Sequence, residues 1–460
     1  MGKIYIELML TNFTCYVKIN VLEEHFMERK MLEKLNEWKN SKNRMPLIIN
    51  GARQVGKTYS LLSFGKEQYK NIAYINFEDN KEAIKIFEKD FNIERIILEL
   101  SVTLGVTILK GDTLIILDEI QACERALTSL KYFCENGSEY HVCAAGSLLG
   151  VAINREKYSF PVGKVSIFTL YPLDFEEFLW AINEKELANL IRKHYINNEE
   201  FALHEKAMEL YRLYLVVGGM PKSILEYLDK KDMNFVNSIL KDINNSYIAD
   251  MAKYATPTET TKLLAVYSTI SSQLAKEYKK FQYKLIKSGA RAYEYENSLN
   301  WLNASGIINK CIKVKEGKLP LSAYMEADSF KIYMTDVALL CNKFAIPVYT
   351  VLTNNENLNN FKGALTENYV CSSLIFAGII PYYWESDGKA EVDFVVQDKY
   401  GNIIPIEVKS SENVRAKSLK IFIDKYNIKY SIRISSKNFG LDNNIKSVPL
   451  YAVFCLEEIR

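Results

Sequence analysis

Eight consecutive residues near the N-terminus match the pattern G-x-x-x-x-G-K-[ST]: Gly51, Ala52, Arg53, Gln54, Val55, Gly56, Lys57 and Thr58. The apolar segment 46–50 before them reads as a buried strand, and 59–70 after them reads as a helix. A glycine-rich loop between a strand and a helix binds anions, because its amides and the helix N-terminus carry partial positive charge. Lys57 is expected to reach the β- and γ-phosphates of a nucleotide, and the Thr58 hydroxyl to bind Mg²⁺. The segment therefore predicts a site for ATP and Mg²⁺.

The composition is that of a large globular protein without a strong charge bias. The chain has 460 residues, enough for about two to four domains, and its 58 Lys and Arg nearly balance 56 Asp and Glu. Any contact with nucleic acid therefore has to come from local basic patches. The eight cysteines form no C-x-x-C pair and the four histidines do not cluster, so neither a zinc site nor a disulfide framework is expected.

The sequence carries no membrane or export signal that we recognise. No apolar run approaches the ~18 residues of a membrane span. The N-terminus has early charged and polar residues and makes a poor signal peptide. We therefore expect a cytoplasmic protein with reduced thiols and no membrane partner.

Between residues 46 and about 180, short apolar strands alternate with helical stretches, as in a parallel α/β sheet. The expected strands are 46–50, 72–77, 113–118, 140–145 and 165–170. The third strand delivers Asp118 and Glu119 to the sheet edge where open α/β sheets bind ligands. Asp118 is expected to hold Mg²⁺ through water, and Glu119 to orient and deprotonate the attacking water. Ser147, after the fourth strand, is expected to hydrogen-bond the γ-phosphate or that water, with a simple Gly-Ser turn as the alternative.

Several motifs, taken in order, resemble the AAA+ superfamily. They are GARQVGKT, LIILDEI, CAAGSLL, FPVGKVSIFTLYPLDFEEFL and YLVVGGMP. More narrowly, residues 27–455 resemble prokaryotic AAA+ ATPases that carry a C-terminal PD-(D/E)XK nuclease-like domain of unknown function. The resemblance implies a γ-phosphate finger in a Gly-Arg pair, where this chain has Gly163 and Lys164. Lysine supplies only a point charge there, and Arg155 is a nearby substitute.

The segment Val217-Gly218-Gly219-Met220-Pro221 interrupts a helical region. It resembles the Gly-x-Pro element of related signalling ATPases, which implies a part in sensing the nucleotide. A helix-breaking turn is the alternative, because glycine and proline both end helices.

A second constellation lies in the C-terminal region. The segment 361–370 reads as a helix that carries Glu367, and strands follow that carry Asp393 and Glu407. Side chains alternate along a strand, so Glu407 and Lys409 project from one face, where Asp393 can join them. Two carboxylates and a lysine can hold Mg²⁺ and activate a water. The arrangement resembles PD-(D/E)XK nucleases, which implies metal roles for Asp393 and Glu407, a base role for Lys409 and an acid role for Glu367. The alternative is a domain that keeps this fold and binds without cutting.

Residues 256–346 are expected to form a winged helix, because helices at 260–274 and 291–304 precede a small hairpin. This unit contains basic residues interleaved with aromatic ones, which could grip phosphates and stack bases. They are Lys276, Tyr278, Lys279, Lys280, Phe281, Tyr283, Lys284, Lys287 and Arg291. A second basic group consists of Arg415, Lys417, Lys420 and Lys425. DNA or RNA is therefore a candidate partner, and solvated charged faces are the alternative.

The expected fold is α/β: a P-loop NTPase with a parallel sheet, a helical lid, a winged-helix domain and a C-terminal restriction-endonuclease-like α/β domain. The expected divisions are an N-terminal extension (1–26), the ATPase core (27–182), the lid (183–255), the winged helix (256–346) and the nuclease-like domain (347–460). The leading hypothesis is an ATPase whose nucleotide cycle controls a module acting on nucleic acid. There are two alternatives. One is a slow ATP-dependent switch that binds DNA or a protein without cleavage. The other is a DNA-binding regulator whose nuclease-like domain is a scaffold. The sequence also leaves open whether the protein forms a homo-oligomer.

Overall fold

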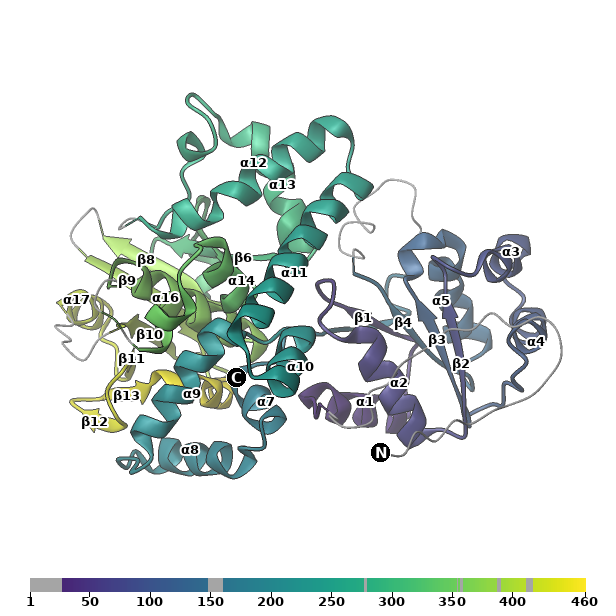
Figure 1. Ribbon diagram of the computed structural model, residues 1–460, viewed down its shortest axis with the longest axis horizontal. Coiled ribbons are helices and arrows are strands. Elements are labelled where there is room, and N and C mark those ends of the chain that lie inside the picture. The colour runs from purple at the N-terminus through teal and green to yellow at the C-terminus, as the bar shows by residue number, and fades with distance from the viewer. Residues whose placement is uncertain are drawn as a thin grey trace.

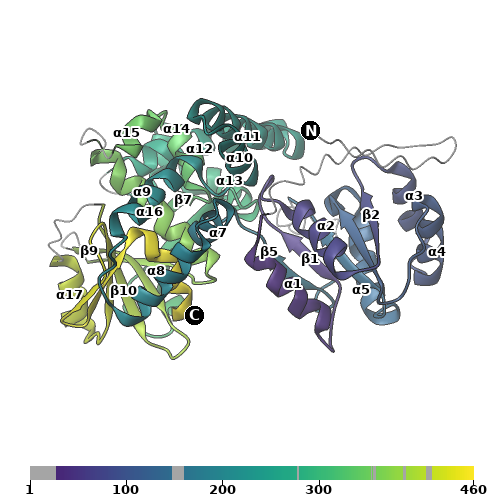
Figure 2. The ribbon, with the colours of Figure 1, turned by 60° about the horizontal axis from the view of Figure 1, so that its bottom comes forward.

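The computed structural model describes residues 27–147, 160–276, 279–353, 355, 359–386, 390–410 and 417–460. The expected extension 1–26 and Arg155 lie outside these ranges. The described chain forms two lobes, an N-terminal one in purple and blue and a C-terminal one in teal to yellow (Figure 1). The second lobe contains the helices after β5 and a second sheet (Figure 2).

The N-terminal lobe contains a five-stranded parallel sheet in the order β2-β3-β4-β1-β5. Its strands are β1 (Leu47–Asn50), β2 (Asn71–Asn76), β3 (Thr113–Asp118), β4 (His141–Ala145) and β5 (Ser166–Thr169). The parallel sheet expected from the sequence is confirmed. Because β1 lies between β4 and β5, the loop that follows it emerges in the interior of the sheet's carboxyl edge.

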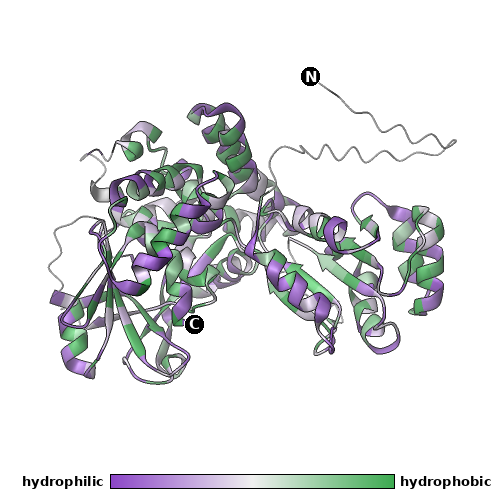
Figure 3. Cartoon of the chain, turned by 90° about the horizontal axis from the view of Figure 1, so that it is seen from below, coloured by the Kyte–Doolittle hydropathy of each residue, from purple (hydrophilic) through white to green (hydrophobic). Residues whose placement is uncertain are grey.

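Helices cover both faces of this sheet, which accounts for the complete burial of β3. They are α1 (Lys30–Asn40), α2 (Lys57–Gln68), α3 (Lys81–Lys89), α4 (Ile93–Leu104) and α5 (Glu124–Asn136), with a short turn η1 (Ile120–Ala122) after β3. Alternate residues of β1 enter different cores: Leu47 and Ile49 join one apolar cluster, and Ile48 joins the other. Figure 3 shows the polar and apolar stripes along the covering helices.

Residues 183–255, expected as a lid, pack mainly with the second lobe. The helices of this region and the one before it are α7 (Phe175–Ala181), α8 (Lys185–Asn197), α9 (His204–Val217), α10 (Pro221–Lys230) and α11 (Met233–Tyr254). Helices α8 and α9 pack against the C-terminal 3-10 segment η5 (Leu450–Ile459). Helix α11 lies between the two lobes (Figure 1). Helices α7 to α11 therefore pack mainly against η5 and the helices of the second lobe.

The expected winged helix differs from the structure at its hairpin. Helices α12 (Pro257–Leu274) and α13 (Ala292–Ala304) match the expected helices closely, and β6 (Ile308–Val314) pairs antiparallel with β7 (Met325–Met334). However, β6 also pairs in parallel with β8 (Tyr382–Ser386). The hairpin is thus the edge of the C-terminal sheet, and the expected division between residues 346 and 347 cuts one continuous sheet. Hydrogen bonds between β6 and β8 join two segments that lie far apart in the sequence. No local sequence pattern predicts this pairing.

The second sheet has eight strands in the order β12-β13-β11-β10-β9-β8-β6-β7. Its remaining strands are β9 (Ala390–Gln397), β10 (Ile403–Val408), β11 (Ser431–Ser435), β12 (Gly440–Asp442) and β13 (Ile445–Pro449). The other elements of this lobe are η2 (Tyr283–Leu285), η3 (Leu321–Tyr324), α14 (Val337–Lys343), α15 (Val348–Leu352), α16 (Asn359–Phe376) and α17 (Lys417–Tyr426). Helix α16 contacts β6, β7 and β10, whereas α17 contacts β9 and β10. These contacts bring α16, the helix of Glu367, against β10, the strand of Glu407.

All seven cysteines in the described part of the chain are free. None of its helices combines the length and the hydrophobicity that a bilayer crossing requires.

Candidate functional site

The phosphate-binding loop, residues 51–58, depends on two glycines with positive φ. Gly51 has φ +147° and Gly56 has φ +95°, values that residues with a side chain rarely adopt. An added Cβ at Gly51 would also lie 2.1 Å from the carbonyl oxygen of Leu170. The Leu170 amide donates to the Asn50 carbonyl at 2.8 Å. The missing side chain at Gly51 therefore lets the loop lie against the end of β5.

Lys57 begins α2, and its side chain lies inside the loop. Its Nζ donates hydrogen bonds to the carbonyl oxygens of Gly51 and Ala52 at 2.9 and 2.8 Å. Burial lowers the pKa of Lys57 to about 8, although the charges of Glu119 and Asp118 work against the shift. Phosphate oxygens would give this ammonium group a stronger, charged partner than the carbonyls do. The position fits the role expected for Lys57.

Thr58 and Asp118 lie side by side, although 60 residues separate them in the chain. The Thr58 hydroxyl donates to Asp118 Oδ2 at 2.7 Å, and Tyr74 on β2 donates to the same oxygen at 2.9 Å. The Glu119 amide donates to the other oxygen, Asp118 Oδ1, at 3.0 Å. Hydroxyl and carboxylate oxygens are the ligands that Mg²⁺ prefers. The pair therefore fits a magnesium ion, and Tyr74 is a supporting residue that the sequence analysis missed.

Glu119 follows β3 with a left-handed backbone, φ +50°. Such a conformation is costly for a residue with a side chain and concentrates at functional sites. Gln121 Nε2 donates to Glu119 Oε2 at 2.5 Å. Burial raises the pKa of Glu119 from its ordinary value, while the Gln121 hydrogen bond works against the shift. A carboxylate with a raised pKa is a better proton acceptor near neutral pH, which fits the expected role as a general base.

Ser147 lies just after β4 and is buried. Ala145 is opposite Ile49 in the parallel pairing of β4 with β1, and the Gly146 amide lies 3.4 Å from the Ile49 carbonyl oxygen that it bonds. Ser147 is therefore at the carboxyl edge of the sheet, beside the residue that precedes the phosphate-binding loop. Its hydrogen bond to phosphate or water stays a prediction.

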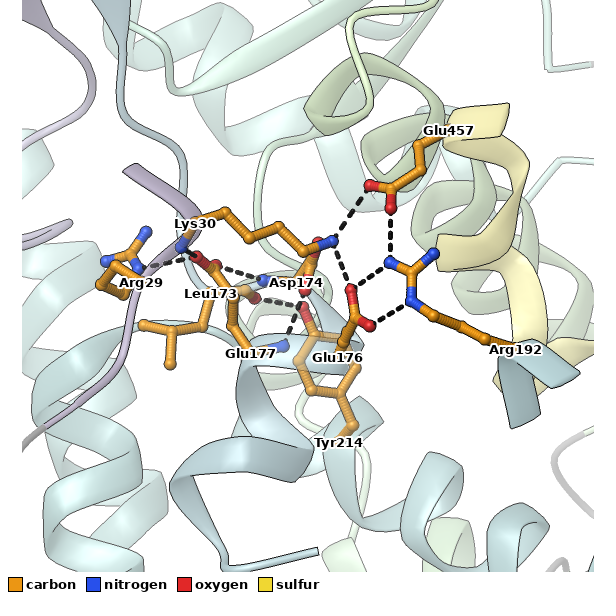
Figure 4. A network of polar contacts seen from close by, with 9 residues as sticks. All are labelled: Arg29, Lys30, Leu173, Asp174, Glu176, Glu177, Arg192, Tyr214 and Glu457. Carbon is orange, nitrogen blue, oxygen red and sulfur yellow. Dashed lines mark hydrogen bonds and ion pairs between the residues drawn. The ribbon is translucent and has the colours of Figure 1, made fainter. Parts of the chain in front are cut away.

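Arg29, to which the sequence pattern assigned no role, supports the loop from outside, and Figure 4 shows its contact with Glu177. Its Nη1 donates to the Val55 carbonyl at 3.0 Å, its Nη2 to the Tyr171 carbonyl at 2.7 Å, and its Nε pairs with Glu177 at 3.2 Å. The Arg29 side chain is 4% exposed. No local pattern could identify it, because its partners lie 26 to 148 residues away along the chain.

The glycine pair between α9 and α10 is a packing site between segments far apart in the sequence. The Gly219 amide donates to Asp336 Oδ2 at 2.7 Å, and the Gly219 carbonyl accepts from the Leu173 amide at 2.7 Å. An added Cβ at Gly219 would lie 2.0 Å from the Leu173 carbonyl oxygen. Pro221 begins α10, and its Cγ lies 3.5 Å from a Cβ built on Gly56. The segment is a tight turn whose last residue adjoins the phosphate-binding loop.

Lys164 is not near the phosphate-binding loop. It lies two residues before β5 and forms a 3.0 Å ion pair with Glu135 in the last turn of α5. The hydrogen bond to Glu135 raises the pKa of Lys164. The amino ends of parallel strands and the carboxyl ends of the helices that follow them share one edge, which is opposite the loop. Lys164 therefore cannot act as a finger on its own nucleotide site.

The structure brings together the C-terminal residues that the sequence singled out. Lys409 Nζ pairs with Glu407 Oε1 at 2.9 Å, and Asp393 Oδ2 accepts from the Val408 amide at 2.8 Å. Burial alone would lower the pKa of Lys409, but the charges of Asp393, Glu407 and Glu367 raise it. All four groups are thus near enough to interact. Burial and the charge of Glu367 raise the pKa of Asp393 to about 7.

Lysines neutralise much of this carboxylate site. Glu367 on α16 forms an ion pair with Lys279 and accepts a hydrogen bond from Tyr333 at 3.3 Å. Burial would raise the pKa of Glu367, but Lys279 and Lys331 outweigh it, so the pKa is lowered. Lys331 on β7 is itself buried and pairs with Glu391. Neither lysine was assigned to this site from the sequence, since both reach it only through tertiary packing.

A divalent cation at this site would have two carboxylates at its disposal. The buried oxygen Glu407 Oε2 has no hydrogen-bond partner among the described residues, which fits the role of a cation ligand. Glu367 is occupied by Lys279 and Tyr333. Within the described ranges, no group of three or more His, Cys, Asp or Glu side chains is arranged to hold a metal ion. The carboxylates that could serve as ligands are therefore Asp393 and Glu407, because Lys279 and Tyr333 engage Glu367.

Phe281 and Tyr283, two aromatic residues of the first basic stretch, pack against other rings of the protein. Phe281 is 5% exposed and stacks on Phe330 with ring centroids 5.4 Å apart. Tyr283 is half-buried against Phe281. The expectation that bases stack on this stretch is therefore wrong for Phe281, because its ring lies in the apolar interior. The exposed basic residues are Lys276, Lys280, Lys284, Lys287 and Arg291, together with Lys417, Lys420 and Lys425 on α17. Tyr278 and Arg415 lie outside the described residues.

Three family models match separate parts of the chain. Residues 43–179 match an AAA domain, residues 208–348 match a domain of unknown function (DUF8612), and residues 362–453 match another domain of unknown function (DUF4143). No curated protein matches the chain. The N-terminal lobe is therefore an AAA-type P-loop ATPase domain, as its parallel sheet and its phosphate-binding loop also indicate.

Similar solved structures have low sequence identity. A Walker-type ATPase of Pyrococcus abyssi is 14% identical with a TM-score of 0.44, and the match covers 69% of this chain and 96% of that one. The Aeropyrum pernix ORC1 protein in complex with DNA is 13% identical with a TM-score of 0.25, over 71% and 91% of the two chains. The Thermotoga maritima RuvB Holliday junction branch migration motor is 13% identical with a TM-score of 0.29, over 64% and 91%.

Proposed function

We propose that this chain binds ATP with Mg²⁺ in the phosphate-binding loop and hydrolyses it. The observation that carries the proposal is the 2.7 Å contact between Thr58 and Asp118, beside the enclosed ammonium group of Lys57. This arrangement supplies a cation for the phosphates and an oxygen pair for the metal at one place.

The chain's own residues would divide the work in a simple way. Lys57 would neutralise charge on the β- and γ-phosphates, and Glu119 would take a proton from the attacking water. Ser147 would hold the γ-phosphate or that water by a hydrogen bond. Thr58 and Asp118 would hold Mg²⁺, which when bound offsets negative charge on the phosphate oxygens.

Two variants and a control test this proposal by phosphate release and by nucleotide binding. Lys57→Ala should abolish hydrolysis. Glu119→Gln should lower turnover by about 10²–10⁴-fold while ATP still binds, because only the base is lost. Lys70→Ala removes an exposed ion pair with Asp112 and should leave turnover unchanged. Undiminished turnover in Lys57→Ala would show that the assignment is wrong.

A second proposal concerns the C-terminal lobe: its carboxylate site acts on nucleic acid under control of the nucleotide cycle. The 2.9 Å contact between Lys409 and Glu407, with Asp393 close by, supports it. Asp393 and Glu407 would hold a divalent cation, and Lys409 would position the attacking water. Glu367 would first have to lose its ion pair with Lys279 before it could take part. Binding without cleavage, as in a slow ATP-dependent switch, is the competing proposal, and the neutralised state of Glu367 favours it.

Cleavage and binding can be separated with plasmid and linear DNA, with Mg²⁺ and with or without ATP. Wild type, Lys57→Ala and Lys409→Ala are compared, with Lys399→Ala as the control, because Lys399 is exposed in the turn between β9 and β10 and belongs to neither basic group. Nicking that is lost in Lys409→Ala and kept in the control supports a nuclease, and loss of its ATP dependence in Lys57→Ala supports control by the nucleotide cycle. A mobility shift without nicking supports the switch that binds DNA. No interaction with DNA or RNA would contradict action on nucleic acid altogether.

A further inference from the structure

Helix α11 contacts the phosphate-binding loop through one face. Gln54 Nε2 donates to Ser246 Oγ at 3.0 Å, and the Tyr247 hydroxyl donates to the Arg53 carbonyl at 3.3 Å. One turn further along, Asp250 Oδ1 pairs with Arg53 Nη1 at 2.5 Å. Residues three and four apart share a helix face, so these contacts form one continuous interface.

The ion pair between Arg53 and Asp250 lies within the electrostatic reach of the catalytic groups. The Arg53 side chain is 34% exposed and the Asp250 side chain only 9%. Burial would lower the pKa of Arg53, but the charges of Asp250 and Glu119 raise it. The charges of both Arg53 and Asp250 also act on Lys57. Since Arg53 belongs to the phosphate-binding loop, its guanidinium group and the Asp250 carboxylate that pairs with it lie at this loop.

We infer that Arg53 is the cation that recognises the γ-phosphate, and that Asp250 on α11 holds it when no triphosphate is bound. The inference rests on the proposed ATP site and adds two residues to it: Arg53 as a ligand of the γ-phosphate and Asp250 as the residue that positions Arg53. A guanidinium group binds phosphate through two parallel hydrogen bonds, which Lys164 cannot supply from the opposite edge of the sheet. A γ-phosphate carries more negative charge than Asp250 and therefore takes Arg53 from it, whereas ADP leaves the pair intact.

This exchange gives α11 a means to distinguish ATP from ADP. Asp250 loses its partner when Arg53 turns to the γ-phosphate, and its negative charge then faces the triphosphate. The same helix packs against α12 and α14 of the second lobe. A change in the contacts between α11 and the loop is therefore transmitted to α12 and α14, which contact β7 of the C-terminal sheet.

Nucleotide affinities in a Glu119→Gln background, where turnover is suppressed, test the inference. Arg53→Gln should weaken ATP binding on the order of tenfold and leave ADP binding nearly unchanged, because one charged hydrogen-bonding partner is lost from the γ-phosphate alone. Asp250→Asn should strengthen ATP binding several-fold, with no change for ADP. Arg53→Lys should recover only part of the loss, since lysine lacks the fork.

Lys253→Gln is the matched control on the same helix. It breaks the 2.8 Å ion pair between Lys253 and Glu78 and loosens α11 without freeing Arg53. Its ratio of ATP to ADP affinity should equal that of the parent. Asp250→Ser is a second variant in case Asp250→Asn unfolds, as monitored by thermal unfolding.

Two results would overturn the inference. One is an Arg53→Gln variant whose ATP and ADP affinities fall equally, and the other is weaker ATP binding in both folded Asp250 variants. Failure of the ATP site itself has a different signature, because Lys57→Ala would then bind and hydrolyse ATP like wild type.

Discussion

The Arg29 guanidinium group donates a 3.0 Å hydrogen bond to the Val55 carbonyl and so attaches the phosphate-binding loop to the start of α1. The next residue continues the connection: Lys30 pairs with Asp174 at 2.8 Å, with Glu176 at 2.6 Å and with Glu457 at 3.2 Å. Arg192 on α8 joins the same acids, Glu176 and Glu457 (Figure 4). The loop is thus linked to the C-terminal segment η5 through side chains of α1, α7 and α8.

Replacing Arg29 should therefore destabilise the fold more than it disturbs chemistry. Arg29→Ala leaves the buried carboxylate of Glu177 without its arginine, and such a loss costs about 3–5 kcal/mol in free energy of unfolding. Urea denaturation followed by fluorescence measures the change. Lys70→Ala breaks the exposed pair with Asp112 and should cost less than about 1 kcal/mol. Equal effects of the two variants would show that Arg29 does not hold the loop.

Lys164 should be dispensable for hydrolysis in an isolated chain. Its ion pair with Glu135 is exposed and lies at the sheet edge away from the loop. Lys164→Ala is expected to keep turnover within about twofold of wild type, because an exposed pair contributes little. Turnover is measured over a range of protein concentrations. A large loss that appears only at high concentration would indicate that a neighbouring copy uses Lys164, contrary to this prediction.

Local chemistry allows the residues of the proposed ATP site to be predicted from the sequence. The glycines and Lys57 of the loop are adjacent in the chain, and Asp118 ends a strand whose burial pattern is evident from its own residues. The carboxylate site was predictable for a similar reason, since strand alternation places Glu407 and Lys409 on one face. In both cases, residues that are close together in the sequence determine the geometry of the site.

Partners that meet through tertiary packing could not be predicted in this way. Asp250 reaches Arg53 from 197 residues away, and Lys279 reaches Glu367 from 88 residues away. The burial of Phe281 depends on Phe330, which comes from a strand later in the chain. The pairing of β6 with β8 likewise depends on a register between separated segments, which no local pattern encodes.

His141 should make the stability of the N-terminal lobe depend on pH. Burial lowers its pKa to about 4, and the charges of Arg44 and Lys39 add to the shift. Its Nδ1 lies 2.7 Å from the Tyr69 hydroxyl. The unfolded chain, with an ordinary histidine pKa of about 6.5, binds this proton first, so stability falls as the pH is lowered from about 6.5 to 4.

Unfolding free energies measured across that pH window check this expectation. His141→Gln should flatten the slope by up to about 1.4 kcal/mol per pH unit, the value for one proton. Tyr69→Phe keeps the ring burial but removes the hydrogen bond, so its slope should remain like that of wild type. An unchanged slope in His141→Gln would mean that other groups control the acid sensitivity.

The contact between Gly219 and Leu173 predicts which glycine the fold cannot replace. A Cβ at Gly219 would lie 2.0 Å from the Leu173 carbonyl oxygen and 2.8 Å from the Leu173 amide nitrogen. This main chain cannot easily move, because the Tyr214 hydroxyl donates to the same carbonyl at 2.7 Å. Gly219→Ala should therefore lower the free energy of unfolding by at least about 3 kcal/mol, at the upper end for an overpacked site.

Gly440 provides the matched comparison for this substitution. A Cβ added there meets nothing within 4 Å, and its φ lies outside the left-handed region. Gly440→Ala should change the free energy of unfolding by no more than about 0.5 kcal/mol, as at ordinary surface positions. Thermal and urea unfolding of both variants give the comparison. If Gly219→Ala were as stable as Gly440→Ala, the turn between α9 and α10 would have to be able to move away from Leu173, and its glycine would then serve a purpose other than close packing.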